Sequence, residues 1–509
     1  MSRINTNPSS LIAQRNLTQN NKSLNTTLER LSTGLRINRG KDDPAGLIAS
    51  EALRSEKTAL SAAIGNAERT DQLVNIAEGG LQELSTLLTD LRGLVTSSAN
   101  NAGLSNEEKR ANQLQIDSIL QTIDRLADST NFQGVKLLNG NFDFNTTAVA
   151  TGVSDFRVNG AKLAKGGPPI TVQAIVTKSA QTGTLFLSTD TSLNLAGNSN
   201  LFTIEVGGSL GSRELSFASG TTRQQIIDAV NTYKDVTGVS GSLYTSGGFT
   251  TIKLNSTTYG SDQFVSVKVV NASGTAGTTG IYNPLSASDT VRPATGGSTA
   301  FSNNNAKNGI RDLGQDIVAT INGVQATTRG RTARVNTDFL DVEVTFTTGQ
   351  STQLASINAF QITGGGADFQ LATRVDIAGK VALGIQNVAS RKLGNSDVGF
   401  LSSLASGKSN NVVDGNLTAA QNVVDEAIRT ISGLRGRLGA FQKNTVGATI
   451  RNLNISLENS SAAESVIRDA DFANETANLT RSQILSQAAQ NSLQLANTAP
   501  QSALSLLRS

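Results

Sequence analysis

Apolar residues recur every seven positions along the first 35 residues of the chain. Leu17, Leu24 and Leu31 form one row of this repeat, and Leu28 and Leu35 each lie four residues after a member of the row. A row with this spacing lies on one face of a helix and is typical of helices that pack lengthwise against others. The sequence therefore predicts an amphipathic helix near its N-terminus.

A second and longer heptad row begins after residue 42. Its spacing of seven is kept over seven consecutive positions, and at about 1.5 Å per residue such a helix would be on the order of 80 Å long. Gly79, Gly80 and Gly93 each weaken a helix by about 1 kcal/mol relative to alanine, so a broken helix is the alternative. The row consists of Leu53, Leu60, Ala67, Val74, Leu81, Leu88 and Val95.

Helical patterns also follow residue 105 and dominate the C-terminal hundred residues. Ser105 and Glu108 have the spacing of a capping box, which predicts a third helix. Heptads resume with Leu417, Val424, Ile431 and Leu438, with Ala420, Ala427, Leu434, Phe441, Ala448 and Ile455 in the companion position. We expect a final helix to end near Pro500. These rows are compatible with packing inside one chain and with packing between chains.

Between the helical ends, at 142–406, the apolar period drops to two. Strict alternation with polar residues predicts half-buried strands, and the stretch 221–231 predicts a short helix between strands. The alternating rows are Phe202, Ile204 and Val206; Val265, Val267 and Val269; and Leu340, Val342, Val344 and Phe346. We expect a mainly β region of one or two subdomains, with the division between two near 271–309, where periodicity is lost. The fold class is thus α+β.

The two end segments, 11–35 and 466–507, contain few aromatic residues and many Asn, Gln, Ser and Thr residues. Two such helices would bury little apolar surface by themselves, which makes them marginal in water. Their amphipathic pattern predicts that they order against copies of the same chain.

Composition excludes much chemistry. The 509 residues include no cysteine, histidine or tryptophan, so thiolate nucleophiles, Ser-His-Asp relays and zinc sites built on His or Cys are ruled out. Charge is almost balanced, with 43 basic and 40 acidic residues, and no basic stripe with aromatics indicates nucleic-acid binding. No apolar run is long enough for a membrane span, and the N-terminus lacks the apolar core of a secretory signal. We predict no catalytic, cofactor-binding or metal-binding residues.

One stretch, Gly34 to Gly46, partly matches a phosphate-binding loop. That loop needs four residues between its first glycine and Gly-Lys, followed by Ser or Thr, but here five residues separate Gly34 from Gly40, and Asp42 replaces the hydroxyl. A structural joint explains the stretch better. Gly34 ends a helix, Gly40 permits a turn, Asp42 or Asp43 caps the next helix, and Pro44 begins it.

Both ends of the sequence resemble bacterial flagellins. The similarity rests on "INTNPSSLIAQRNL", "LERLSTGLRINRGKDDPAGL" and "STNFQGVKLLNG" near the N-terminus, and on "LGAFQKN", "ENSSAAESVIRDADFANETANLTRSQILSQAAQ" and "SALSLLRS" near the C-terminus. The resemblance implies a non-enzymatic structural subunit that polymerises into the flagellar filament for motility. In this family, terminal helices form an inner coiled-coil tube, the next helices form an outer tube, and the middle projects outward.

The resemblance also implies a division of the chain and a role for particular residues. The inner coiled-coil domain would comprise 1–42 and 459–509, the outer-tube domain 43–141 and 407–458, and the surface-exposed β region 142–406. Inner-tube contacts fall on Leu17, Leu24, Leu28, Leu31, Leu35, Phe472, Leu479, Ile484 and Leu485. The joint between tubes falls on Asn38, Gly40, Asp42, Asp43 and Pro44, and the outer-tube seam on Leu53, Leu60, Val74, Leu81, Leu88, Val95, Leu434, Leu438 and Phe441.

The family's contact with a flagellin-sensing Toll-like receptor falls on Leu88, Asp90, Arg92, Gly93 and Leu94. Receptor-activating relatives have a basic residue where this chain has an aspartate and a glutamate where it has a glycine, so we expect weak activation. The other implied partners are copies of the chain, the flagellar cap and hook-junction proteins, and an export chaperone that binds about 466–507. Export through the flagellar type III apparatus would need no cleaved signal peptide and would deliver the subunit to the extracellular filament.

Three alternatives share some of these features. A hook-filament junction protein has helices of the same style, although the length and the C-terminal motif favour a filament subunit. The central region of a flagellin could also act as a glycan-binding adhesin, since it is rich in serine and threonine. An intracellular coiled-coil scaffold is the third alternative.

Overall fold

The computed structural model describes residues 6–100, 103–164, 167–195, 201–246, 249–272, 280–284 and 298–508. These residues divide into two compact units. The first unit contains Met1–Gln72, Phe369–Lys380 and Ala440–Ser509, and the second contains Leu73–Asp368 and Val381–Gly439. The long helices therefore contribute to both units, whereas nearly all strands belong to the second.

The two N-terminal helices are α1 (Pro8–Thr33) and α2 (Pro44–Ser98). Gly34, with a left-handed φ of 72°, ends α1, and its N–H donates to the carbonyl of Arg30. The predicted alternative of a break does not occur, because α2 continues through Gly79, Gly80 and Gly93. Fully buried side chains on the same helix, among them Leu81 and Leu84, offset the low helix propensity of glycine.

The C-terminal helical segment is continuous over fifty residues but changes its winding once. It consists of α8 (Leu417–Ala440), the π-helical turn η2 (Phe441–Val446) and α9 (Gly447–Arg468). A π turn takes up an extra residue, so the apolar row shifts around the helix. Val446 is buried, whereas Ala448 and Ile455, which we expected to continue the row, are exposed.

The last helix begins after a short interruption at Asp469–Asp471. Because α9 runs to Arg468, the expected boundary at 458/459 falls inside a helix. The final helix, α10 (Phe472–Arg508), passes through Pro500, so the expected end there is wrong. A proline removes one backbone donor from the helix, and the flanking residues here keep their helical backbone.

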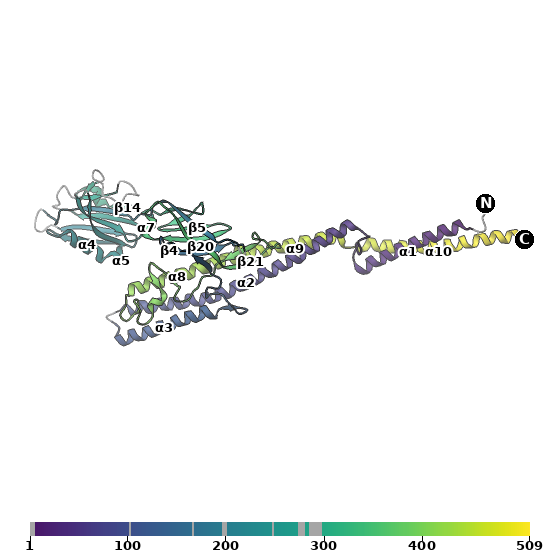
Figure 1. Ribbon diagram of the computed structural model, residues 1–509, viewed down its shortest axis with the longest axis horizontal. Coiled ribbons are helices and arrows are strands. Elements are labelled where there is room, and N and C mark those ends of the chain that lie inside the picture. Colours follow the sequence, from purple (N-terminus) through teal and green to yellow (C-terminus); the bar gives the residue numbers. More distant parts are fainter. Residues whose placement is uncertain are drawn as a thin grey trace. The chain divides into compact units, whose positions relative to one another are not determined.

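In the second unit, three helical segments pack lengthwise: the later part of α2, α3 (Asn106–Ser129) and α8 (Figure 1). The capping box of Ser105 and Glu108 is confirmed at the start of α3. Arg435 of α8 pairs with Glu78 of α2 at 2.7 Å, so these two helices are fixed to each other by charge as well as by apolar packing. Their buried core comprises Leu88, Leu91, Val95, Ile116, Ile123, Val424, Ile431, Leu434 and Leu438.

The first β core of this unit is built from two antiparallel sheets. One has the order β16–β15–β5–β20–β3, with β3 (Phe144–Thr147), β5 (Ile170–Lys178), β15 (Val318–Ile321), β16 (Val324–Gln325) and β20 (Ser356–Gly365). The other has the order β17–β18–β19–β4, with β4 (Val153–Ala161), β17 (Thr327–Arg329), β18 (Thr332–Asn336) and β19 (Leu340–Phe346). The predicted alternation in β19 is confirmed: its four apolar residues are buried and the three between them are not.

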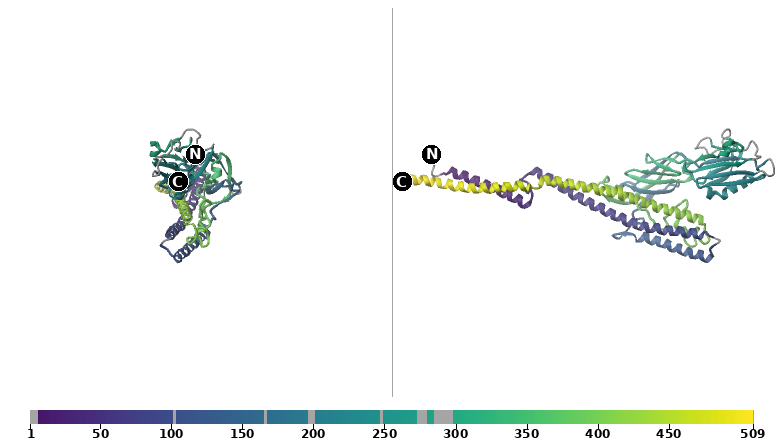
Figure 2. Two further views of the ribbon diagram at one scale, coloured as in Figure 1. Left: turned by 90° about the vertical axis from the view of Figure 1, so that its left-hand side faces the viewer. Right: turned by 180° about the vertical axis from the view of Figure 1, so that it is seen from behind.

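The second β core lies between β5 and β15 in the sequence, and Figure 2 shows it as a separate body beside the first. One sheet has the order β13–β12–β6–β10–β9, with β6 (Thr184–Ser188), β9 (Val239–Ser246), β10 (Phe249–Ser256), β12 (Gly280–Tyr282) and β13 (Ser298–Ala300). The other has the order β14–β11–β7–β8, with β7 (Leu201–Gly208), β8 (Ser212–Ala218), β11 (Phe264–Asn271) and β14 (Ile310–Leu313). The predicted short helix is α4 (Arg223–Thr232), capped by Thr222.

The second core is thus nested in the first, and this corrects the expected division near 271–309. Much of that stretch lies outside the described residues, but Val269 before it and Ile281 and Phe301 within it share one core. The crossing points are instead at 180–184 and 312–317. There Gln181 and Gln315 exchange two backbone hydrogen bonds of 2.9 Å, which holds the entry and exit of the nested core side by side.

Short elements complete the fold. They are the hairpins β1 (Asn131–Phe132) with β2 (Val135–Lys136), β21 (Ala367–Gln370) with β22 (Lys380–Leu383), and β23 (Gly394–Asn395) with β24 (Gly399–Phe400), the helices α5 (Lys234–Thr237), α6 (Asn304–Asn308) and α7 (Thr348–Ser351), and the 3-10 turn η1 (Leu401–Leu404). Gly365, the last residue of β20, and Gly366 have φ of 84° and 80° at the turn into β21.

Candidate assembly surfaces of the terminal helices

Helices α1 and α10 lie side by side and run antiparallel (Figure 1). The contacts between them are largely polar. Asn7 Nδ2 donates to the carbonyl of Ala496 at 2.8 Å near the start of α1, and Asn20 Nδ2 donates to the carbonyl of Leu485 at 3.1 Å near its middle. Amide side chains, which are abundant in both helices, therefore set the register of the pair.

The pair buries few apolar side chains. Within α1, only Ala13 and Thr27 are buried. Among the residues expected in the inner tube, Phe472 is 69% exposed and Ile484 is 64% exposed. Leu28 and Leu485 are also exposed, whereas Leu17, Leu24, Leu31, Leu35 and Leu479 are half-buried. None of these nine apolar residues is therefore fully buried in a single chain, and four of them are exposed.

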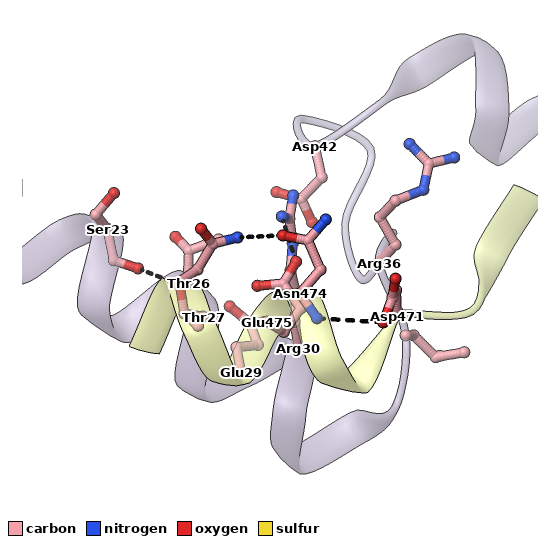
Figure 3. Close-up of polar contacts among 12 residues, drawn as sticks. Ser23, Thr26, Thr27, Glu29, Arg30, Arg36, Asp42, Asp471, Asn474 and Glu475 are labelled. Atoms are coloured by element: carbon pink, nitrogen blue, oxygen red, sulfur yellow. Dashed lines mark hydrogen bonds and ion pairs between the residues drawn. The ribbon is translucent and has the colours of Figure 1, made fainter. Parts of the chain in front are cut away.

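One charged pair crosses between the helices in a more enclosed place. Arg30 of α1 points toward Glu475 of α10, with Nη1 and Oε1 3.1 Å apart (Figure 3). The Glu475 side chain is only 9% exposed. A carboxylate removed from water in this way is stabilised only while its cation is present.

The turns that follow α1 and α9 are joined by backbone hydrogen bonds. Leu35 and Asp469 form an isolated antiparallel bridge, in which Arg36 N donates to the carbonyl of Arg468 at 2.7 Å. Ala470 N donates to the carbonyl of Gly34 at 2.9 Å. Both helical segments are therefore interrupted at the same place, and each interruption satisfies backbone groups of the other.

The two aspartates of the joint accept hydrogen bonds from different backbone groups. Asp43 Oδ1 accepts from Gly46 N at 2.9 Å and so caps α2, which begins at Pro44 as expected. Asp42 Oδ2 instead accepts from the backbone N–H groups of Asn38 and Arg39. The hydrogen bond from the Arg39 backbone lowers the pKa of Asp42. The joint is thus a closed turn whose donors are occupied by carboxylates.

Sequence reasoning overlooked two residues of this joint. Ile37 is 1% exposed, and Gly46 leaves no room for a methyl group, because a Cβ there would lie 2.6 Å from Ile37 Cδ1 and 2.5 Å from Asp43 Oδ2. Gly40, by contrast, has an ordinary negative φ and space around it. The only sign of this packing in the sequence is that Ile37 is apolar and stands in an otherwise polar turn.

The outer-tube seam residues are mostly buried within the chain. Leu60, Val74, Leu81, Leu88, Val95, Leu434 and Leu438 are buried, Phe441 is at the margin of burial, and Leu53 is half-buried. Packing within one chain therefore explains why the outer-tube seam residues are apolar. The same explanation does not cover the exposed apolar residues of α1 and α10.

Burial also changes the expected receptor surface. Leu88 is completely buried, so its side chain does not reach the surface of the folded chain, and the receptor role of the other residues stays a prediction. Asp90, Gly93 and Leu94 line an open groove of about 590 Å³ between α2 and α3. Arg92 is half-exposed, and its Nε lies 3.1 Å from Asp425 of α8.

Among the described residues, no group of carboxylates is arranged to hold a metal ion. The same residues contain no helix that combines the length and the apolar character of a membrane span.

Comparison with known proteins agrees with this architecture. The bacterial flagellin N-terminal helical region matches residues 4–143, and the bacterial flagellin C-terminal helical region matches residues 421–507. The chain is 31% identical to the B-type flagellin of Pseudomonas aeruginosa, 28% identical to the flagellin of Salmonella typhimurium and 26% identical to flagellin A of Helicobacter pylori. Each of these similarities covers 99% of both proteins.

Long terminal helices around a β middle thus define a structural protein of the α+β class. The chain belongs to the bacterial flagellin family. It is a structural subunit of the flagellar filament, which in this family is extracellular.

Proposed function

We propose that the α1–α10 pair of each subunit packs against the pairs of neighbouring subunits through the apolar side chains that it leaves exposed. The observation that carries this proposal is the exposure of Phe472 and Ile484, together with Leu28 and Leu485, on the two terminal helices. Burial of one such side chain contributes about 1.5–3 kcal/mol. A few of them per subunit outweigh the polar contacts that hold a single pair together.

In this proposal, 1–42 and 459–509 form the inner tube, and its C-terminal part consists mainly of α10, which follows the interruption at Asp469–Asp471. Residues 43–141 and 407–458 form the outer tube, and 142–406 forms the surface-exposed region. The bridge between Leu35 and Asp469 supports a joint at this point, because it fixes both chain segments where they leave the α1–α10 pair.

A matched pair of substitutions on α10 tests the assembly surface. Ile484→Asp places a charge on the exposed apolar row, and Gln483→Asp places the same charge on the exposed neighbouring residue. Seeded with short filament fragments and observed by electron microscopy, the Gln483→Asp protein should form filaments and the Ile484→Asp protein should not. Deletion of 1–35 or 470–509 should also abolish filaments. Normal filaments from Ile484→Asp would refute the proposal.

Export and capping are further parts of the proposed function. The subunit would leave the cell through the flagellar type III apparatus, with a chaperone bound to about 466–507 and cap and hook-junction proteins at the filament ends. Exposed apolar residues on α10 support a chaperone, since they need cover before assembly. Co-purification of the full chain with its export chaperone would test this step. The wild-type chain should co-purify with the chaperone, and the double variant Ile484→Asp with Leu485→Asp should not.

The chain should activate a flagellin-sensing Toll-like receptor only weakly. Asp90 and Gly93 are exposed on α2 where activating relatives carry a basic residue and a glutamate. Exchanging both, as Asp90→Arg with Gly93→Glu, should raise the response of reporter cells. A wild-type response equal to that of an activating flagellin would contradict this part of the proposal.

A further inference from the structure

The loop between β21 and β22 presents apolar side chains to solvent. Val375 is 87% exposed, a larger fraction than for any other large apolar residue that the structure describes, and Ile377 is 42% exposed. Arg374 and Asp376 alternate with them. We refer to residues 374–377 as the loop tip.

The loop tip is held in one conformation by its own hydrogen bonds. Gln370 Nε2 donates to the carbonyl of Arg374 at 2.6 Å, and Asp376 Oδ1 accepts from Gly379 N at 2.6 Å. Leu371 N donates to the carbonyl of Gly379 at 3.1 Å and closes the loop. A Cβ at Gly379 would meet Gln370, Arg374 and Ala372 within 2.9 Å, so the chain is close-packed here. Presenting these side chains to a partner would therefore cost little ordering entropy.

The base of the loop is anchored on a helix of the first unit. Phe369, at the end of β21, packs on Phe441 with ring centroids 5.8 Å apart, and Leu371 is 4% exposed. Phe441 opens the π-helical turn η2. The loop tip thus belongs to the same compact unit as the assembly helices α1 and α10.

A lone exposed valine is ordinary on a protein surface. A loop that only reversed the chain would be expected to carry polar and turn-forming residues at its tip. Here two β-branched residues stand two positions apart on a rigid tip, in a chain whose function is to pack against copies of itself. Other exposed apolar residues of the same unit, such as Ile455 and Val466, lie on α9 and offer an apolar surface on a neighbouring copy.

We propose that the loop tip at 374–377 packs against a second copy of this chain in the filament. The contact would be separate from that of the terminal helices. It would link the subunits through a segment that lies outside both matched helical regions.

The chain contains no cysteine, so the reactivity of a single introduced thiol measures the accessibility of that position alone. Val375→Cys is compared with Leu210→Cys, since Leu210 is 66% exposed in the nested β core. Both thiols should react with a maleimide at similar rates in monomers. In seeded filaments, Val375→Cys should react at least tenfold more slowly, and Leu210→Cys should react as before. Equal rates for Val375→Cys in monomers and filaments would overturn the proposal.

A second pair of variants measures the contribution to assembly. Val375→Asp should raise the protein concentration needed for filament growth at least fivefold, while Leu210→Asp leaves it unchanged. Circular dichroism of the monomers should match that of the wild type in both cases. If Val375→Asp grows filaments at the wild-type concentration, the loop tip is not a contact between copies. Failure of Val375→Cys to assemble, with normal circular dichroism and normal Leu210→Cys filaments, would support the proposal.

Discussion

Arg30 and Glu475 are linked across the two terminal helices by an ion pair of 3.1 Å, and the carboxylate is almost fully enclosed. Arg30 Nε is also buried and makes no hydrogen bond within the described part of the chain. The pair therefore depends on both partners being present. It fixes the register of α1 against α10 at the end of the pair that is next to the joint.

Removal of the carboxylate should weaken the α1–α10 pair. Glu475→Ala leaves the partly buried Arg30 guanidinium without its ion-pair partner, at a cost of about 1–2 kcal/mol. Since 1–2 kcal/mol is a factor of roughly 5–30, the concentration needed for filament growth should rise by a similar factor. Sedimentation of filaments at graded protein concentrations measures this.

The matched control is the exposed pair of Arg329 and Asp262, whose side chains are 85% and 61% exposed. Asp262→Ala should change the assembly concentration less than twofold, because exposed ion pairs contribute about 0–1 kcal/mol and this one lies in the β region. An equal effect of the two substitutions would show that the Arg30–Glu475 pair is no stronger than a surface pair.

The joint should be sensitive to a methyl group at Gly46 and tolerant of one at Gly40. At Gly46, the added Cβ would displace the Asp43 carboxylate that caps α2 and press on buried Ile37. Loss of a cap together with overpacking costs on the order of 1–3 kcal/mol. At Gly40, a Cβ would be at an ordinary 3.6 Å from Leu47. Gly46→Ala should therefore reduce filament yield or change filament shape in electron micrographs, and Gly40→Ala should not.

The joint also shows what sequence patterns can and cannot predict. Pro44 and Asp43 have local roles, a first helical position and a cap, so their residue types were sufficient. The constraint at Gly46 depends on Ile37, which folds back onto the helix, and no pattern along the sequence encodes that contact. The joint residues expected from the sequence therefore include Gly40 but not Gly46.

Long-range features were missed for the same reason. The heptad row predicted the helices α8 and α9, but not the π turn at Phe441 that shifts the buried face to Val446. Alternating residues predicted single strands such as β19, but strand partners distant in sequence decide which core a strand joins. The nesting of one β core within another depends on the bridge between Gln181 and Gln315, two residues with no distinctive pattern around them.

The nested core should be removable. Because Gln181 and Gln315 exchange two hydrogen bonds, deletion of 182–314 with a two-glycine link spans a gap of only one strand spacing. Among the described residues between Ala180 and Ile317, none is a buried member of the first core's apolar cluster, although the partly buried Tyr259 packs against it. The buried cluster should therefore stay intact. The shortened protein should remain a folded monomer with a cooperative thermal transition and should still form filaments. A deletion of equal length that starts inside the first core, such as 172–304, should aggregate.

Asp143 should make the second unit less stable as pH rises. Burial raises the pKa of its carboxyl above 3.8, against the lowering effects of the Phe144 and Asn387 backbone N–H groups and of Lys392 and Arg437. A carboxyl with a raised pKa in the folded state binds its proton more tightly there than in the unfolded chain. Its ionised form therefore destabilises the fold above the raised pKa, and this penalty disappears as pH falls toward 4.

Asp143→Asn removes the charge and keeps an oxygen that can accept from Phe144 N, which Asp143 Oδ1 does at 2.9 Å. The thermal midpoint of the variant should be higher than that of the wild type at pH 7, and the two should converge near pH 4. Asp128→Asn, at an exposed position, serves as the control and should follow the wild type throughout. A lower midpoint for Asp143→Asn at pH 7 would mean that hydrogen bonding by the carboxylate outweighs its desolvation, because the substitution leaves the size of the side chain unchanged.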